Sequence, residues 1–317
     1  MSLLLPGAFL VVGLVVLVFA ADQFVAGAEA VALRLRWSAA VIGAVVVGFG
    51  TSLPEFVTSV TGAWRGDADL AIGNAAGSNV ANLLLILGIA ALVAPIAGRR
   101  DQAPVRDGII AGVGGVVLLA LSIDGAIGVV DGIVLVVALL AAVAWQVRAA
   151  SDGPPGGDEM PLAPADRFVG ARVVLGLAGV LVGAQLLVSG AIDLAEAAGL
   201  PQILIASVLV AVGTSLPELA TAVASARRGQ VEILLGNLLG SNAFNALFVV
   251  GGSALVAAAR GDGLAVDTPA LAVVVAAAVV TGLAAMVLAR RPIVSRPVGA
   301  VLVALHLASV PALLAIS

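Results

Sequence analysis

The sequence predicts an all-α polytopic membrane protein with ten transmembrane helices, arranged as two inverted five-helix repeats. Three observations predict this class. The 317 residues are 62% hydrophobic and 11% charged, with a mean hydropathy of +1.20, which is more apolar surface than a water-soluble chain of this length could bury. Ten apolar segments are long enough to cross about 30 Å of hydrocarbon. One stretch also recurs at a fixed offset of 163 residues.

The ten segments follow one another with short connections. They lie near residues 5–32, 39–63, 69–95, 108–123, 128–147, 170–195, 202–226, 231–257, 269–289 and 298–315. The first is predicted to be a retained span and not a signal peptide, because MSLLLP carries no basic residue and the apolar run continues to about Leu33.

The internal repeat is the strongest organisational signal. Residues 48–88 align without a gap to residues 211–251, with 19 identities in 41 positions. The chain therefore divides into halves of five spans, 1–148 and 169–317, and an odd number of spans forces the halves into opposite orientations. Inverted repeats are typical of secondary transporters, which bind substrate near the midplane between the halves. Between them, residues 149–168 (AASDGPPGGDEMPLAPADRF) are rich in proline, glycine and acid, which predicts a flexible cytoplasmic linker.

Arginine predicts the orientation in the bilayer. All fifteen basic residues are arginine. With both termini outside, thirteen of them fall on the inner side, and Arg65 and Arg260 fall on the outer side. Because cytoplasmic loops carry the excess of positive charge, we expect an integral protein of a prokaryotic plasma membrane with the N-terminus and C-terminus outside.

The hexapeptide GTSLPE occurs at 50–55 and again at 213–218. Pro54 and Pro217 interrupt helical hydrogen bonding and free a carbonyl four residues earlier, which lipid tolerates only where protein or a cavity supplies a partner. Glu55 and Glu218 follow directly. A carboxylate at mid-depth costs on the order of 2.5–3.5 kcal/mol, so its duplication in identical surroundings predicts a function.

Neutral oxygen groups accompany each glutamate. Thr51 and Ser52 lie four and three residues before Glu55, so both hydroxyls are expected on its helical face, and Thr214 and Ser215 have the same spacing from Glu218. Downstream, GNAAGSNVAN and GNLLGSNAFN bring two further serine–asparagine pairs: Ser78 with Asn82, and Ser241 with Asn245. Hard oxygen ligands of this kind suit calcium. The chain contains no cysteine and one histidine, so soft metal ligands do not compete with this interpretation.

The duplicated, inverted motif GTSLPE…GN-x-x-GSN-x-x-N resembles the two repeats of the calcium/cation antiporter superfamily, and the microbial sodium/calcium exchangers are most similar in length and span count. The resemblance covers essentially the whole chain. It implies calcium ligation by Glu55, Glu218, Thr51 and Thr214. It implies sodium sites at Ser52, Ser78, Ser215 and Ser241 with main-chain oxygen near Gly48 and Ala211, and it places Asn82 and Asn245 at the central position. The first and sixth spans would be the sliding elements.

The resemblance implies a secondary-active antiporter that exchanges Ca²⁺ for Na⁺ by alternating access, with no enzymatic activity and no cofactor. One chain carries both halves, so a monomer would suffice; the lipid bilayer is the expected surrounding and nucleic acid is not an expected partner. Asn245 stands where some relatives carry aspartate, which leaves two obvious carboxylates. The residues therefore also allow Ca²⁺/H⁺ exchange on the same glutamate pair. A cation channel and an intramembrane hydrolase are weaker alternatives, because inverted duplication is unusual for channels and no Ser/His or metal–His constellation accompanies the acids.

Two further acids lie in the first span. Asp22 is interpreted either as a structural hydrogen-bonding group or as a participant in transport. Glu29 is near the inner end of that span and is expected to form an interfacial ion pair with Arg34.

Overall fold

The computed structural model describes residues 4–97, 103–152, 168–199, 211–290 and 293–314. Helices dominate this part of the chain, and four two-residue strands join helix ends. The first part comprises α1 (Leu4–Leu35), α2 (Ala39–Ile42), the π-helical η1 (Gly43–Gly48), α3 (Phe49–Thr51), α4 (Leu53–Arg65), α5 (Ala68–Ala81), η2 (Asn82–Ile86), α6 (Leu87–Val93), β1 (Ile96–Ala97), α7 (Ala103–Ser122), β2 (Ala126–Ile127) and α8 (Val129–Asp152).

The later part of the chain repeats much of this order. It comprises α9 (Val169–Ala197), α11 (Ala211–Thr214), α12 (Leu216–Arg227), α13 (Val231–Phe244), η4 (Asn245–Val249), α14 (Val250–Ala259), β3 (Leu264–Ala265), α15 (Thr268–Arg290), β4 (Ile293–Val294) and α16 (Arg296–Leu314). Helix α8 continues through residues 149–152, which the sequence assigned to the linker.

Six helical segments of the described chain are long and apolar enough to cross a membrane, and the bent pair Ala39–Thr51 and Leu53–Arg65 makes a seventh. Shorter apolar helices cover Thr268–Ala284 and Arg296–Ser309. The predicted span 202–226 lies partly outside the described residues. An all-α membrane protein is therefore established, and the count of ten spans stays a prediction.

The proline of the first motif breaks its helix as predicted. The axes of the segments before and after Ser52 differ by 46°, and Pro54 stands in the first turn of α4, where its missing N–H removes no intrahelical bond. The second copy has the same local geometry, because Ser215 separates α11 from α12 with φ −90° and ψ 5°, against −83° and 8° at Ser52.

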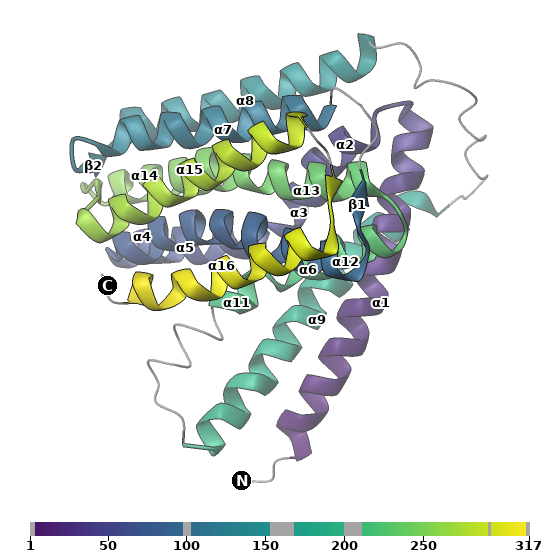
Figure 1. Ribbon diagram of the computed structural model, residues 1–317. Coiled ribbons are helices and arrows are strands. Elements are labelled where there is room, and N and C mark those ends of the chain that lie inside the picture. The colour runs from purple at the N-terminus through teal and green to yellow at the C-terminus, as the bar shows by residue number, and fades with distance from the viewer. Residues whose placement is uncertain (1–3, 98–102, 153–167, 200–210, 291–292, 315–317) are drawn as a thin grey trace.

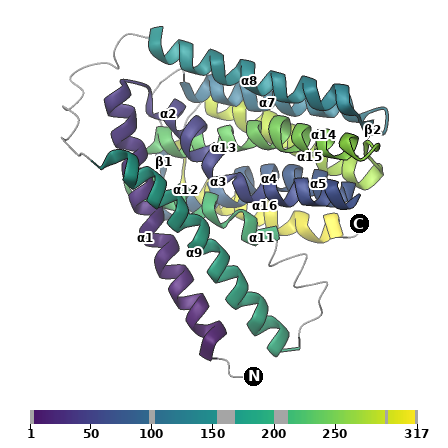
Figure 2. The same ribbon diagram turned by 180° about the vertical axis from the view of Figure 1, so that it is seen from behind.

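Helices α1 and α9 lie side by side and extend away from the other helices (Figures 1 and 2). Glycine permits this close contact. A Cβ added to Gly183 would lie 2.5 Å from the Leu17 backbone nitrogen, and one added to Gly13 would lie 2.5 Å from the Leu187 nitrogen. Backbone therefore packs directly on backbone along this pair, as small residues allow between membrane helices.

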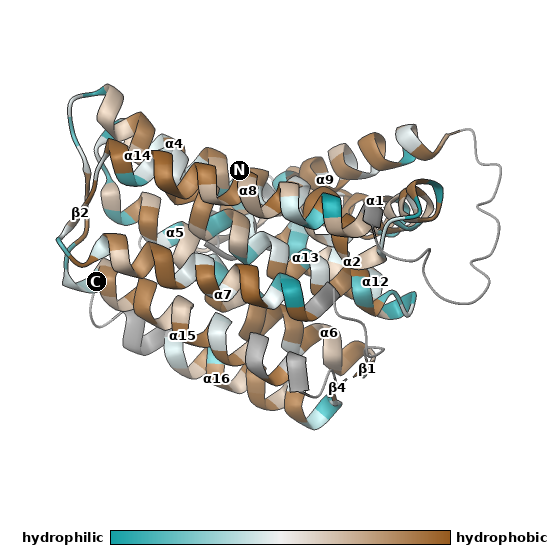
Figure 3. Ribbon diagram, turned by 90° about the horizontal axis from the view of Figure 1, so that it is seen from above, coloured by the Kyte–Doolittle hydropathy of each residue, from teal (hydrophilic) through white to brown (hydrophobic). Residues whose placement is uncertain are grey.

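The centre of the molecule is formed by α13 and its neighbours. The most apolar window of the segment Val231–Ala259 is 89% buried, against 28% for Leu4–Leu35, so the first is central and the second peripheral. Outward faces carry exposed valine and leucine side chains, and Figure 3 shows hydrophobic residues along the helices with hydrophilic residues gathered at loops and helix ends. This distribution suits lipid as the surrounding solvent.

Two short antiparallel ladders tie the halves together. Strand β1 pairs with β4, with Ile96 opposite Val294, and β2 pairs with β3, with Ile127 opposite Leu264. Each ladder joins a strand before residue 149 to one after residue 168. They lie at opposite ends of the helical bundle (Figures 1 and 3).

Candidate ion-binding site

The helix breaks position both motif glutamates in the same way. Glu55 lies in the first turn of α4, and Glu218 lies in the first turn of α12. A helix N-terminus favours negative charge because its first N–H groups are free. Both side chains are 1% exposed, so the carboxylates are held inside the protein among helices.

Serine hydroxyls from both halves of the chain reach these carboxylates. The Ser52 hydroxyl donates to Glu218 Oε1 at 3.1 Å, and the Ser215 hydroxyl donates to Glu55 Oε1 at 3.4 Å. Ser78 also donates to Glu55 Oε1 at 3.5 Å and lies 3.5 Å from the Ser215 hydroxyl. The prediction that each serine lies on the helical face of the glutamate that follows it is wrong, because the helix is interrupted at the serine and its hydroxyl bonds to the glutamate of the other half.

Thr51 and the remaining serine, Ser241, are linked to main-chain oxygen. Thr51 donates to Val47 O at 3.0 Å and to Gly48 O at 3.4 Å, and the Ser241 hydroxyl donates to the same Gly48 oxygen at 3.2 Å. Thr51 also contacts Asn237 Oδ1 at 3.3 Å. Helix α13 approaches Gly48 closely, so the Gly48 carbonyl accepts hydrogen bonds from both halves of the chain.

The second copy begins at the edge of the described chain. Ala211 is the first residue of α11, and Thr214 is its last, directly before the break at Ser215. Their backbone positions correspond to Gly48 and Thr51 in the first copy.

Among the described residues, four buried side-chain oxygens at this site have no hydrogen-bond partner. They are Glu55 Oε2, Glu218 Oε2, Asn82 Oδ1 and Asn245 Oδ1. Buried polar atoms in proteins are nearly always partnered, and leaving one unpaired costs free energy. The four atoms form two pairs on residues that the repeat makes equivalent, which we call repeat mates: Glu55 with Glu218, and Asn82 with Asn245. All four are acceptors. A hard cation would partner all of them.

An asparagine network holds the amides of Asn82 and Asn245, and its other members were not predicted as site residues. Asn82 Nδ2 donates to Asn242 Oδ1 at 2.9 Å, and Asn245 Nδ2 donates to Asn79 Oδ1 at 3.1 Å. Asn79 and Asn242 are themselves repeat mates within the two GSN triplets, and that repetition is the signal that could have identified them.

The π-helical segments η2 and η4 begin at Asn82 and Asn245. Such segments are frequent at functional sites. Their repetition at the offset of 163 residues was not foreseen, because no residue type in these stretches marks a widened helical turn.

The two acids of the first span contact the second half. Arg228 lies 3.1 Å from Asp22 Oδ1 and 3.4 Å from Glu29 Oε2, and Gln230 Nε2 donates to Glu29 Oε1 at 2.5 Å. Asp22 therefore forms a hydrogen-bonded ion pair between the halves, and its participation in transport stays an open alternative. The contacts of Glu29 link α1 to the end of α12, and the Glu29–Arg34 pair stays a prediction.

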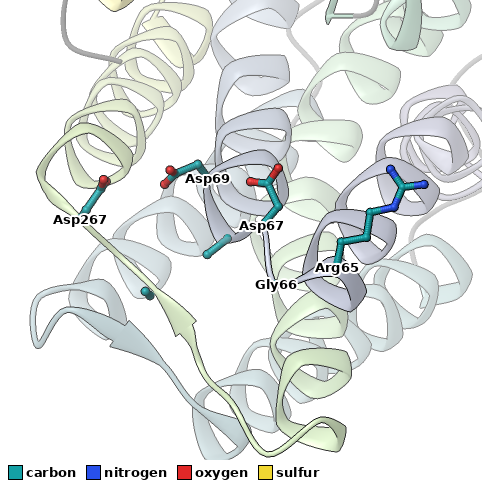
Figure 4. Close-up of a pocket in the computed structure, with 7 residues that line it drawn as sticks. Arg65, Gly66, Asp67, Asp69 and Asp267 are labelled. Carbon is teal, nitrogen blue, oxygen red and sulfur yellow. The ribbon is translucent and has the colours of Figure 1, made fainter.

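An open pocket of about 450 Å³ lies elsewhere, at the start of α5 (Figure 4). Asp67 and Asp267 accept hydrogen bonds from Leu70 N and Ala270 N, both at 2.9 Å, so these two acids serve as helix caps. Within the described residues, no cluster of three or more His, Cys, Asp or Glu side chains is arranged to hold a metal ion.

An apolar helical chain with paired carboxylates and neutral oxygens buried at broken helices defines a membrane transporter for cations. The chain belongs to the sodium/calcium exchanger protein family, whose model matches residues 5–148 and 169–314. It is 38% identical over 258 residues to the putative antiporter CaxA of Alkalimonas amylolytica, covering 78% of this chain and 80% of that one. It is 36% identical over 279 residues to the inner membrane protein YrbG of Escherichia coli, covering 83% of each.

A solved structure has the same fold. The sodium–calcium exchanger NCX_Mj, soaked with 10 mM Na⁺ and 10 mM Sr²⁺, matches with a TM-score of 0.84 and 30% sequence identity, covering 98% of this chain and 99% of that one. Family membership and this likeness support cation antiport, including antiport of Ca²⁺, as the activity class of the chain.

Proposed function

We propose that this chain exchanges Ca²⁺ for Na⁺ across a prokaryotic plasma membrane by alternating access. The observation that carries the proposal is the set of four unpartnered oxygens on Glu55, Glu218, Asn82 and Asn245. Two carboxylates offset the charge of one Ca²⁺, and the amide oxygens add neutral ligands. Hydroxyls and the Gly48 carbonyl lie within the same network.

Sodium competes with calcium for the same glutamates in this proposal. Ser52, Ser78, Ser215 and Ser241, together with main-chain oxygen at Gly48 and Ala211, form the adjoining sodium positions. Thr51 and Thr214 complete calcium coordination. The ions are cargo, and the protein needs no cofactor and performs no chemical conversion.

The proposed architecture is ten spans in two inverted halves, 1–148 and 169–317, with both termini outside. The equivalent breaks at Ser52 and Ser215, the equivalent π segments and the two inter-half ladders support it. Exchanging the conformations of the halves would open the site to either face. The glycine-rich contact of α1 and α9 supports a sliding role for this pair, and one chain carries the whole site.

The test is transport by the purified protein in sealed liposomes. With Na⁺ loaded inside, uptake of ⁴⁵Ca²⁺ should follow the outward sodium gradient and should stop when the gradient is dissipated. A proton gradient imposed with sodium absent should drive no uptake. Uptake that follows ΔpH and ignores sodium would instead establish Ca²⁺/H⁺ exchange on the same glutamate pair.

A further inference from the structure

The four asparagines of the repeated motifs form one buried network that is symmetric between the halves. The Asn79 amide nitrogen donates to the main-chain oxygen of Asn242 at 3.0 Å, and the Asn242 amide nitrogen donates to the main-chain oxygen of Asn79 at 3.1 Å. The Asn82 and Asn245 amides then donate to Asn242 Oδ1 and Asn79 Oδ1. The side chains are between 0% and 4% exposed, so water does not replace any of these contacts.

The two main-chain carbonyls determine the orientation of every amide in the network. A carbonyl can only accept, so the group of Asn79 that faces Asn242 O must be its NH₂. The Asn79 oxygen is thereby directed to the other side, where it can only be paired with a hydrogen-bond donor. The NH₂ group of Asn245 is that donor, and the Asn245 oxygen is left without a partner among the described residues. The second half is arranged in the same way: the Asn242 NH₂ donates to Asn79 O, and the Asn242 oxygen accepts from the Asn82 NH₂.

Orientation matters because the two ends of an amide have opposite effects on a cation. The oxygen is a ligand, whereas the NH₂ group presents two donors and repels positive charge. We propose that Asn79 and Asn242 are positioning residues that hold the oxygens of Asn245 and Asn82 available to the transported cation. This inference rests on the proposed function, since it requires that the cation binds at these amides.

Partners that orient metal ligands typically contribute 10–100-fold to affinity. The test is a substitution at Asn79. In the described part of the chain, its amide hydrogen bonds join it to members of the network, whereas Asn242 also donates to Thr281 at 3.2 Å. Asn79→Leu keeps the side-chain size and removes the orienting oxygen. It should weaken ⁴⁵Ca²⁺ binding to the purified protein in sodium-free buffer by about 10-fold or more.

The decisive comparison repeats Asn79→Leu in a protein that already carries Asn245→Asp. A carboxylate presents oxygen in either orientation, so it needs no orienting partner. In this background Asn79→Leu should change ⁴⁵Ca²⁺ affinity by less than about twofold, or should tighten binding because it removes an oxygen facing the carboxylate. Equal weakening in both backgrounds would show that Asn79 acts through packing alone and would overturn the proposal.

Asn74→Leu is the matched control. Asn74 lies on the same helix and donates to Glu55 O and to the Ser59 hydroxyl, at 3.1 and 2.9 Å, rather than to Asn82 or Asn245. Its effect should be the same in both backgrounds. If Asn79→Leu does not yield a monodisperse protein, the comparison is run with Asn79→Ser. It is also run on the equivalent pair of the repeat, with the substitution placed at Asn242 and the aspartate background made by Asn82→Asp. Unmutated protein that binds no ⁴⁵Ca²⁺ would refute the proposed function. Protein that binds ⁴⁵Ca²⁺, but in which Asn79→Leu has the same effect with Asn245 as with Asp at that position, would refute the positioning role alone.

Discussion

Ser52 donates a hydrogen bond to Glu218 Oε1 at 3.1 Å although 166 residues separate them. Its repeat mate Ser215 donates to Glu55 at 3.4 Å, so the relationship is reciprocal. Each carboxylate therefore depends on a helix break in the other half. A movement of one half relative to the other would alter both pairs, so in the proposed exchanger ion ligation would depend on conformation.

Loss of one carboxylate should strongly weaken calcium binding. We expect Glu218→Gln to weaken ⁴⁵Ca²⁺ affinity by roughly 10²–10⁴-fold, because removing one member of a buried charge interaction costs about 3–5 kcal/mol. Glu55→Gln should behave in the same way. The control is Glu196→Gln, at an exposed position near the end of α9. Retained transport in either glutamine variant would remove that residue from the site.

The two serines at the breaks should be equivalent. Ser52→Ala and Ser215→Ala each remove a hydrogen bond to a carboxylate, worth about 1.5–3 kcal/mol, so each should reduce ion affinity by roughly 10–100-fold. Competition of Na⁺ against ⁴⁵Ca²⁺ binding measures this. Ser122→Ala is the matched control, since Ser122 is 1% exposed but donates only to Leu118 O within its own helix. Markedly different effects of the two break serines would contradict a reciprocal site.

Restoring the helix at the first break should stabilise the protein and impair transport. Pro54→Ala supplies the N–H that Gly50 O lacks, and this favours a continuous helix in place of the 46° bend. We expect an unchanged or higher Tm together with an uptake rate at least about tenfold lower. Pro269→Ala is the control, because Pro269 also stands in the first turn of a helix but no helix directly precedes it. Full activity of the Pro54 variant would show that the break is dispensable.

The contact between α1 and α9 should tolerate no added methyl group at its closest point. Gly183→Ala would place Cβ 2.5 Å from the Leu17 nitrogen, and overpacking of this kind typically costs about 1–3 kcal/mol. A lower Tm and slower ⁴⁵Ca²⁺ uptake are expected. Gly170→Ala, on the same helix with nothing within 4 Å of its added Cβ, should leave both unchanged. Equal Tm values for the two variants would argue against direct backbone packing at Gly183.

Much of the architecture could be predicted from local features. Apolar segments, arginine placement and the repeated hexapeptide are readable along the chain, because membrane burial and the proline break depend on nearby residues. The bend at Pro54 follows from that reasoning. The predicted linker was too long at its start, since α8 continues to Asp152 and apolar helices can extend past the hydrocarbon.

The sequence by itself determined the membrane-helical class, the duplicated motif and the glutamates that carry the charge. Only the tertiary structure decided which groups meet: Ser52 with Glu218, Asn79 with Asn242, and Arg228 with Asp22. These pairs join residues more than 160 positions apart, and their formation depends on how helices cross and where each helix ends. Spacing within one helix gives no information on that crossing, so the reciprocal arrangement became visible only once the two halves were packed together.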